Sequence, residues 1–232
     1  MKYEAPMAAK RWSVLKAVYA FIILSGIAAV PLAKGNEFSC PDSRVPGVGP
    51  WDYNDPEIRI GNPSEPQGKL KLVENTHFHL EFETLTGESN ERLDGDISYT
   101  LHAIPNHYRA LLAISRLEKK LGGQLPRFKT DRTHTADCFF ERAVRYRPED
   151  ANVWMAQGMH LHSRGRYKEA LASYKRAEEL GNNSITFFYN FGLLWFELKD
   201  YDHAVEYAKR AYDGGWPLPG LANKLKSVGR WP

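Results

Sequence analysis

Cysteine is scarce in the sequence, and so is any excess of charge over most of its length. Only two of the 232 residues are cysteines, so the chain can form at most one internal disulfide. The net charge of +3 arises in residues 1–16, because residues 17–232 hold 27 basic and 27 acidic side chains. A protein whose main partner is nucleic acid carries a surplus of basic residues that neutralise phosphates. We therefore expect no nucleic-acid partner.

Sequence motifs of common enzyme sites are also missing. The chain contains no G-x-x-x-x-G-K-[ST], no G-x-S-x-G and no H-E-x-x-H. Cys138 and His134 are close enough in sequence to form a nucleophile and a base, but no group that would orient the base is evident. We expect a protein without catalytic residues and without a cofactor.

An uncharged apolar run, AVYAFIILSGIAAVPLA, covers residues 17–33 and follows the basic start of the chain. This pattern is typical of an export signal. Gly26-Ile27-Ala28 fits the preference for small residues at a cleavage site, whereas the run also comes near the roughly 17–25 residues that span a bilayer. We predict that residues 1–33 are a signal peptide or an N-terminal membrane anchor. The protein would then be exported to the periplasm, either free or anchored in the inner membrane.

The C-terminal half repeats itself with a period of 34 residues. Four pairs of identical residues share this spacing: Gly158 and Gly192, Tyr167 and Tyr201, Ala170 and Ala204, and Ala177 and Ala211. This period, with small and aromatic residues at these places, resembles the tetratricopeptide repeat, a pair of antiparallel helices. The resemblance covers residues 106–218 and implies a mainly α fold, an α-α superhelix of about three helix pairs.

The spacing of residues within one repeat indicates how its two helices pack. Trp154 and Leu161 lie seven residues apart on one face of the first helix, and Gly158 between them allows the second helix to approach closely. That second helix offers Ala170 and then Tyr174, a small and a large residue, to fill the space beside the glycine.

The last repeat departs from this pattern at Ala208, where a large aromatic residue belongs. Tyr207 or Tyr212 could compensate. Apolar residues at helical spacing within residues 219–232 predict one more helix, which would cap the stack.

The stretch THTADCFFERAVRYRPED, residues 133–150, has the alanine and aromatic spacing of a second helix closed by Pro148. Its first helix is predicted within NHYRALLAISRLEKKLGG, so an insertion at about 122–132 separates the two. Residues 97–104 carry apolar side chains at helical spacing and indicate a further, degenerate unit. We therefore place the helical repeats at 96–218.

The segment before the repeats, residues 34–95, is predicted to be an irregular strap rich in proline, glycine and asparagine. Within it, HFHLEFE alternates apolar and polar side chains, the pattern of a short strand. Its polar face would carry zinc-type ligands, namely His77, His79, Glu81 and Glu83. No further ligand is evident, so a solvated face is the simpler interpretation. A metal-binding or enzymatic site at His77 and His79 is the alternative.

Cys40 in the strap and Cys138 in the repeats could form the single disulfide of an exported protein. Cys138 lies about 200° around its helix from the packed Ala136, so it faces away from the neighbouring helix pair, where the strap can reach it. We predict a bridge between the two. The alternative is two free thiols that simply fill space.

The resemblance implies that the first helix of each repeat lines a concave face. One stripe of each such helix predicts the groove residues, which are Arg109, Leu112, Arg116, Lys119, Asn152, Met155, Met159, His162, Thr186, Tyr189, Leu193 and Phe196. One end of this stripe is basic and the other apolar, which suits a protein or peptide segment with an acidic stretch or a terminal carboxylate. The alternative is that the strap fills the groove itself.

Short stretches such as GPWDY, VENTHF and CFFERA also resemble a group of uncharacterised exported bacterial proteins with tetratricopeptide repeats. That likeness implies location and organisation, and no activity. We predict a non-catalytic scaffold of the bacterial cell envelope that binds a protein or peptide through the concave face. Contact with a membrane is expected only through residues 1–33.

Overall fold

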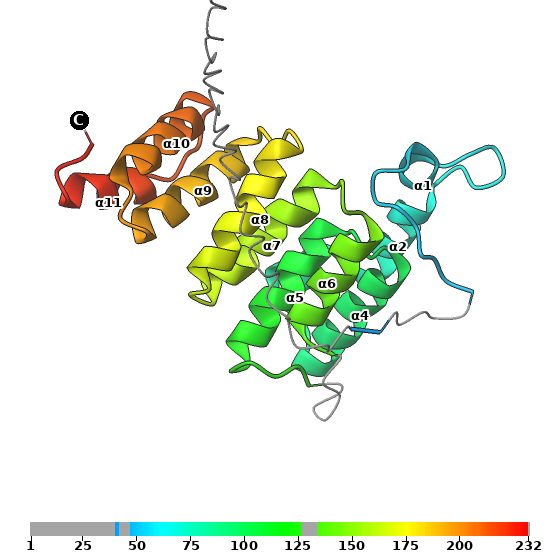
Figure 1. Ribbon diagram of the computed structural model, residues 1–232. Helices are drawn as coiled ribbons and strands as arrows, with labels where there is room; N and C mark the ends of the chain where they lie inside the picture. The colour runs from blue at the N-terminus through cyan, green and yellow to red at the C-terminus, as the bar shows by residue number, and fades with distance from the viewer. Residues whose placement is uncertain (1–39, 42–46, 127–133, 232) are drawn as a thin grey trace, which may run out of the picture. The chain divides into compact units, whose positions relative to one another are not determined.

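The computed structural model describes residues 40–41, 47–126 and 134–231 (Figure 1). The predicted signal peptide or anchor, residues 1–33, lies outside them. In the part of the chain that is described, no helix is both long and apolar enough to cross a membrane.

Eleven helices make up most of the described residues, which also include an isolated β-bridge between Asn62 and Glu65. The helices are α1 (Pro56–Ile60), α2 (Lys69–His77), α3 (Leu80–Thr84), α4 (Asn90–Ala103), α5 (Tyr108–Lys120), α6 (Ala136–Tyr146), α7 (Ala151–Ser163), α8 (Tyr167–Glu179), α9 (Ile185–Glu197), α10 (Tyr201–Asp213) and α11 (Gly220–Ser227).

Side-chain caps fix where several of these helices begin. Asp150 accepts hydrogen bonds from the backbone N–H groups of Asn152 and Val153 at the start of α7, and Ser184 accepts one from Phe187 at the start of α9. Such caps satisfy N–H groups that have no partner within the helix. The turn after α7 passes through Gly165, whose φ of +73° suits glycine.

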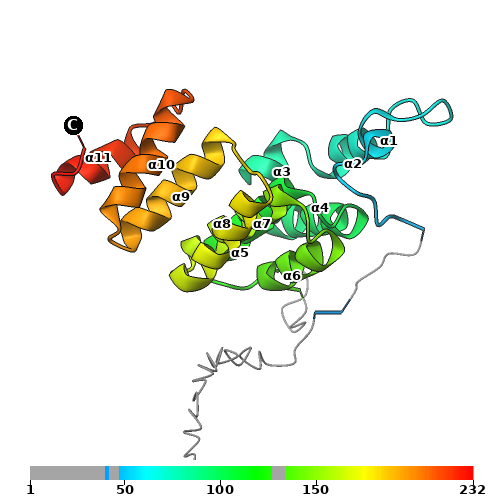
Figure 2. The ribbon, with the colours of Figure 1, turned by 45° about the horizontal axis from the view of Figure 1, so that its top comes forward.

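Consecutive helices pack as antiparallel pairs, and adjacent pairs stack as in a tetratricopeptide-like superhelix. Figures 1 and 2 both show α7 beside α8 and α9 beside α10. The insertion leaves α5 and α6 in contact with each other, and α5 also contacts α4 and α7. The mainly α fold predicted from the period is confirmed.

The close approach predicted at the repeat glycines is present. A β-carbon on Gly158 would lie 3.0 Å from ring atoms of Tyr174, which is completely buried. At the equivalent Gly192 a β-carbon would meet Leu221 Cδ2 at 2.7 Å and Tyr207 Cβ at 3.3 Å. Tyr207 and the capping helix α11 together therefore occupy the space that Ala208 leaves.

The described part of the strap contains the helices α1, α2 and α3 between irregular stretches, so the prediction of a short strand at HFHLEFE is wrong. His77 ends α2, Phe78 and His79 connect the two helices, and Leu80–Glu83 belong to α3. Phe78 and Phe82 are buried, but Leu80 between them is 68% exposed. Residues four apart share a face of a helix as well as of a strand, so this buried pair is compatible with either period. The helical region also begins earlier than residue 96, because α4 starts at Asn90.

A disulfide joins Cys40 to Cys138 on α6, with the two Cα atoms 5.4 Å apart, as predicted. Hydrogen bonds also hold the backbone of residues 40–41 against α6. Arg145 Nη2 donates to the carbonyl of Cys40 at 2.7 Å, and Arg142 Nε donates to that of Pro41 at 2.8 Å. The beginning of the described chain is therefore fixed to the outer helix of the first pair.

A buried asparagine links the strap to the repeats. The side chain of Asn106 accepts a hydrogen bond from the backbone N–H of Tyr53 at 2.9 Å. Its Nδ2 donates to Asp52 Oδ1 at 2.7 Å and to Asp150 Oδ2 at 3.0 Å. Because Asp150 also caps α7, one side chain connects the strap, the turn before α5 and the start of the next pair.

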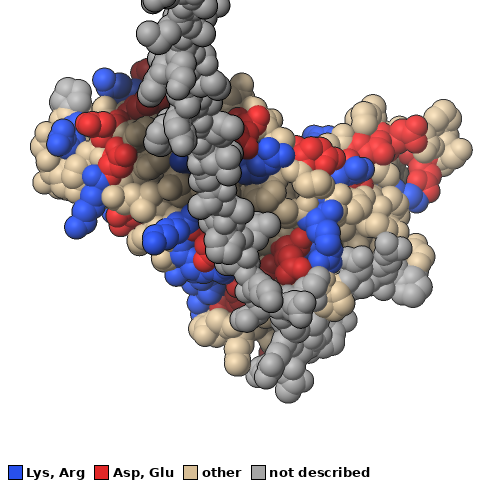
Figure 3. Space-filling model, viewed as in Figure 1, with Lys and Arg blue, Asp and Glu red and all other residues tan. Residues whose placement is uncertain are grey.

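The described surface carries both signs of charge. On the face seen in Figure 3, acidic and basic side chains are interspersed, and no large area of one sign stands out. This distribution agrees with the equal numbers of basic and acidic residues after residue 16.

Candidate functional site

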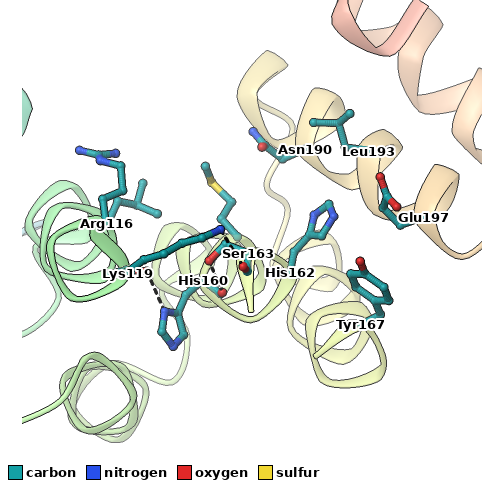
Figure 4. A pocket seen from close by; sticks show the side chains of 12 residues that line it. Arg116, Lys119, His160, His162, Ser163, Tyr167, Asn190, Leu193 and Glu197 are labelled. Carbon is teal, nitrogen blue, oxygen red and sulfur yellow. Dashed lines mark hydrogen bonds between the residues drawn. The ribbon is translucent and has the colours of Figure 1, made fainter. Parts of the chain in front are cut away.

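The first helices of three successive pairs, α5, α7 and α9, surround one cavity of about 460 Å³ (Figure 4). Its lining residues come from these helices and from the start of α8: Leu112, Ser115, Arg116, Lys119, Met159, His160, His162, Ser163, Tyr167, Asn190, Leu193 and Glu197. None of the described residues of the strap lines this cavity.

The α5 side of the cavity is basic. Arg116 Nη2 donates to the backbone carbonyl of Glu83 at 2.7 Å, and Lys119 Nζ donates to that of Ser163 at 2.9 Å. Figure 4 shows Lys119 reaching across toward Ser163. Both cations are exposed, and both use only neutral carbonyl groups as hydrogen-bond acceptors within the described residues. Neither cation forms a salt bridge there, although the carboxylate of Glu83 also acts on Arg116 through its charge.

The floor of the cavity comes from α7, through Met159 and His162. Burial lowers the pKa of His162, and the nearby cations Lys224 and Lys119 act in the same direction against Glu197. A histidine pKa below its usual value leaves the ring neutral at pH 7. The floor therefore adds an uncharged aromatic group and a thioether rather than a third cation.

The α9 side carries Asn190, Leu193 and Glu197. Glu197 is paired with Lys224 of α11 at 3.1 Å, so its charge is compensated from outside the cavity. Asn190 Nδ2 donates to the carbonyl of Thr186 at 2.8 Å. Opposed to the basic α5 side, this wall is neutral on balance and partly apolar.

Six of the twelve predicted groove residues line the cavity. They are Leu112, Arg116, Lys119, Met159, His162 and Leu193. These six occupy the middle and the last turn of α5, α7 and α9, where the three helices face one another.

Arg109, at the strap end of the predicted groove, lies outside the cavity. Its guanidinium pairs with Glu83 of α3 and also with Glu74 of α2, at 3.1 Å from Nη1 to Glu74 Oε1. Hydrogen bonds from Arg109 hold the pKa of Glu83 below its usual value. The strap therefore occupies this end of the groove.

The other five predicted groove residues take part in packing. Asn152 and Met155 contact the side chain of Asn182, through Asn152 Oδ1 at 3.2 Å and Met155 Sδ at 3.7 Å. Thr186 accepts the hydrogen bond from Asn190. In the first half of α9, Tyr189 stacks on Trp216, and in its last turn Phe196 packs against Tyr201.

Sequence reasoning missed the other lining residues, which are Ser115, His160, Ser163, Tyr167, Asn190 and Glu197. Most lie one position beside a predicted stripe residue. The predicted stripe on each helix was narrower than the face that lines the cavity, so it omitted these residues. Widening each stripe by one position would have found Ser115, His160, Ser163, Asn190 and Glu197, but not Tyr167, which belongs to a second helix.

The buried side chain of His160 is the centre of a hydrogen-bond network that reaches the exposed Asp137. Ser115 Oγ and His160 Nδ1 are 2.7 Å apart, and His160 Nε2 lies 3.2 Å from Asp137 Oδ1. The order Ser, His, Asp is that of a nucleophilic triad. However, Ser115 is only 4% exposed inside α5, where the backbone N–H groups are bonded within the helix and cannot stabilise an oxyanion. These hydrogen bonds join α5, α6 and α7 to one another.

The proposed metal face does not form, because it required a strand. His77 Nδ1 lies 2.6 Å from Asp96 Oδ1, His79 pairs with Glu81, and Glu83 is bound to Arg109. Across residues 40–41, 47–126 and 134–231, no group of three or more His, Cys, Asp and Glu side chains is placed to hold a metal ion. The alternative at His77 and His79 therefore loses the geometry on which it rested.

The central helices carry a recognisable family signature. Residues 136–185 match the tetratricopeptide repeat family. The matched stretch runs from α6 through α7 and α8 to the start of α9, and so includes the floor of the cavity. Tetratricopeptide repeats generally mediate protein–protein interactions and are typically not enzymes. No curated protein matches the sequence significantly.

Proposed function

We propose that this protein is a non-catalytic scaffold of the bacterial cell envelope that binds a segment of another protein in the cavity between α5, α7 and α9. The observation that carries the proposal is the cavity itself, to which three first helices of successive repeats contribute side chains. A stack of helix pairs buries the contacts between its repeats and presents its inner face to a ligand. The tetratricopeptide match supports a protein as that ligand.

Location in the envelope is supported by the sequence of residues 1–33 and by the disulfide. The apolar run that follows a basic start is typical of an export signal, cleaved or retained as an anchor. The Cys40–Cys138 bridge suits an oxidising compartment such as the periplasm, since cytosolic thiols are kept reduced.

Site-specific photo-crosslinking in living cells tests the proposal. A photoreactive amino acid at Leu193, in the cavity, should give a discrete adduct with a protein of the envelope fraction. The same amino acid at Lys175, exposed on α8 and outside the cavity lining, is the matched control. Met159→Glu should remove the Leu193 adduct by placing a charge on the cavity floor. Equal adducts at both positions, or an adduct that survives Met159→Glu, would reject the cavity as the binding site.

A further inference from the structure

His107 lies where the strap meets the repeats, at the start of α5. We propose that this histidine makes the docking of α2 and α3 on α5 sensitive to pH, so that both helices are closed on α5 at neutral pH and open locally in mild acid. The switch goes beyond the proposed binding of a partner, and only its effect on the cavity rests on that function.

Two hydrogen bonds fix which nitrogen of the His107 ring carries the proton. Nδ1 accepts the backbone N–H of Ala110 at 3.1 Å and so caps the start of α5. A neutral imidazole has one N–H group, so the proton lies on Nε2, which donates to Glu74 Oε1 of α2 at 3.1 Å. The neutral ring therefore holds the beginning of α5 and the strap at the same time.

Aromatic rings enclose His107 on the strap side. Its side chain is 0% exposed, and the rings of Tyr53 and Phe78 both lie edge-on to it, with 4.8 Å between centroids. Tyr53 in turn lies edge-on to Tyr108. Burial raises the pKa of the Tyr53 phenol, so this ring stays uncharged at pH 7. Water therefore reaches His107 only when the strap moves.

The closed arrangement opposes a second proton on the ring. Burial is the main cause that lowers the pKa of His107, and it outweighs the hydrogen bond to Glu74. A proton on Nδ1 would also point at the N–H of Ala110, so the cap of α5 would be lost. An open strap returns the ring to water, where the charged form is no longer disfavoured. Protonation and opening therefore favour each other.

The charged groups around His107 balance one another while its ring is neutral. Glu74 in α2 and Glu83 in α3 are the carboxylates, and Arg109 of α5 pairs with both. Arg116 donates to the backbone carbonyl of Glu83 and also interacts with its charge. The Oε1 atom of Glu74 that accepts from His107 already accepts from Arg109 at 3.1 Å. An imidazolium would therefore add a positive charge that these carboxylates do not compensate.

The helix that would open has few contacts to lose. α3 has five residues, and the side chain at its N-cap makes no capping hydrogen bond. It ends at Leu85, whose φ of +59° is a left-handed conformation that a non-glycine residue adopts only at a cost. Its hold on α5 includes the bonds of Glu83 to Arg109 and Arg116. Such a segment can open while the repeats remain folded.

Opening of α3 would also change the cavity. Arg116 lines the cavity and is bound to the carbonyl of Glu83, and Arg109 lies at the end of the groove that the strap occupies. Release of Glu83 would free both guanidinium groups and lengthen the groove toward the start of α5. Mild acid would thus enlarge the surface that a partner can contact.

Hydrogen exchange of the full-length protein at about pH 7.5 and about pH 5.5 tests the switch, after correction for the intrinsic effect of pH on amide exchange. The opening equilibrium constant of α2 and α3 should rise in acid, whereas those of α9 and α10 should change little. The ordinary histidine pKa of about 6.5 in the open state limits the rise to about tenfold over this range. Equal opening constants of α2 and α3 at the two pH values would overturn the proposal.

The variant His107→Asn assigns the effect to this residue. Asparagine keeps a side-chain acceptor for the N–H of Ala110 but takes up no proton, so the pH dependence in α2 and α3 should disappear. His77→Asn is the matched control, because His77 also links α2 to the repeats, through Asp96 at 2.6 Å, but has a partly exposed ring. It should keep the pH dependence.

A pH dependence that survives His107→Asn, or that is lost in His77→Asn, would contradict the role of His107. A missing crosslink at Leu193 together with pH-dependent opening of α2 and α3 would reject the binding function and leave the switch intact.

Discussion

Gly158 on α7 lies directly against the ring of Tyr174 on α8, so closely that an added methyl group would require the ring to shift. A β-carbon there would come within 3.0 Å of three ring atoms. The ring of Tyr174 is also stacked on Phe191 of the following helix pair, so it has little freedom to move aside. One contact thus sets how closely α7 and α8 approach and also how the next pair is placed.

Replacing Gly158 by valine should destabilise the protein because the added methyl groups overlap the fixed ring. Overpacking of this kind costs typically about 1–3 kcal/mol of unfolding free energy. Urea denaturation followed by circular dichroism measures the loss. Lys175→Ala on the exposed face of α8 serves as the control and should change little. A Gly158→Val variant as stable as the parent would mean that α7 and α8 can move apart to admit the added methyl groups without cost.

Removing the hydroxyl group of Tyr174 should stabilise the protein. The group is completely buried and has no hydrogen-bond partner among the described residues. Burial without a partner raises the pKa of this phenol. Leaving a buried polar group unpaired costs about 1–3 kcal/mol. Tyr174→Phe removes the hydroxyl and keeps the ring, so it should stabilise the protein by about 1 kcal/mol.

Thermal denaturation of Tyr174→Phe, compared with Tyr207→Phe, makes this prediction specific. The Tyr207 hydroxyl donates to Glu178 at 2.6 Å, so its loss should be neutral or destabilising. A drop in melting temperature for Tyr174→Phe would indicate that its hydroxyl has a partner after all.

The repeats could be predicted from the sequence because their packing is encoded at a fixed spacing. Gly158 and Tyr174 belong to one helix pair, and a 34-residue period repeats such contacts in the next. The strap has no repeat to compare with, and the four-residue spacing of Phe78 and Phe82 suits a strand as well as a helix. The exposure of Leu80 distinguishes the helical period from the strand period, but exposure cannot be seen in the sequence.

The cavity could be predicted only in part for a related reason. Leu112, Met159 and Leu193 follow from the helical period of their own helices. Which neighbouring positions join them depends on how far one helix is rotated and shifted against the next, and the period does not contain this information. Glu197 and Tyr167 line the cavity through that offset.

Acid should destabilise the protein through Asp137. The hydrogen bond to His160 is the main cause that lowers the pKa of this carboxyl to about 2, and Arg166 also contributes. A carboxyl whose pKa is lower in the folded state stabilises the fold above its unfolded pKa of about 3.9. That stabilisation is lost as the pH falls from about 4 to about 2. Because Asp137 is 61% exposed, the effect is reduced by solvent screening.

The Asp137→Asn variant isolates this contribution. Between pH 5 and 7 it should melt at a lower temperature than the parent, and the difference should shrink as the pH falls from 4 to 2. Asp213→Asn, on the last turn of α10, is a control for the change of charge alone. A difference that stays constant over the whole range would show that the Asp137 carboxylate does not stabilise the fold through its charge.

Removing the disulfide should weaken the attachment of the strap to α6 without unfolding the repeats. The bridge closes a loop with a sequence separation of 98, and such links typically contribute about 2–4 kcal/mol. In Cys40→Ser/Cys138→Ser we expect a lower urea midpoint and faster hydrogen exchange in α6, because residues 40–41 then keep their hydrogen bonds to Glu141, Arg142 and Arg145 but lose the covalent link. Exchange in α9 and α10, which the bridge does not touch, is the internal control. Uniformly faster exchange in all helices would instead show that the strap and the repeats unfold as one unit.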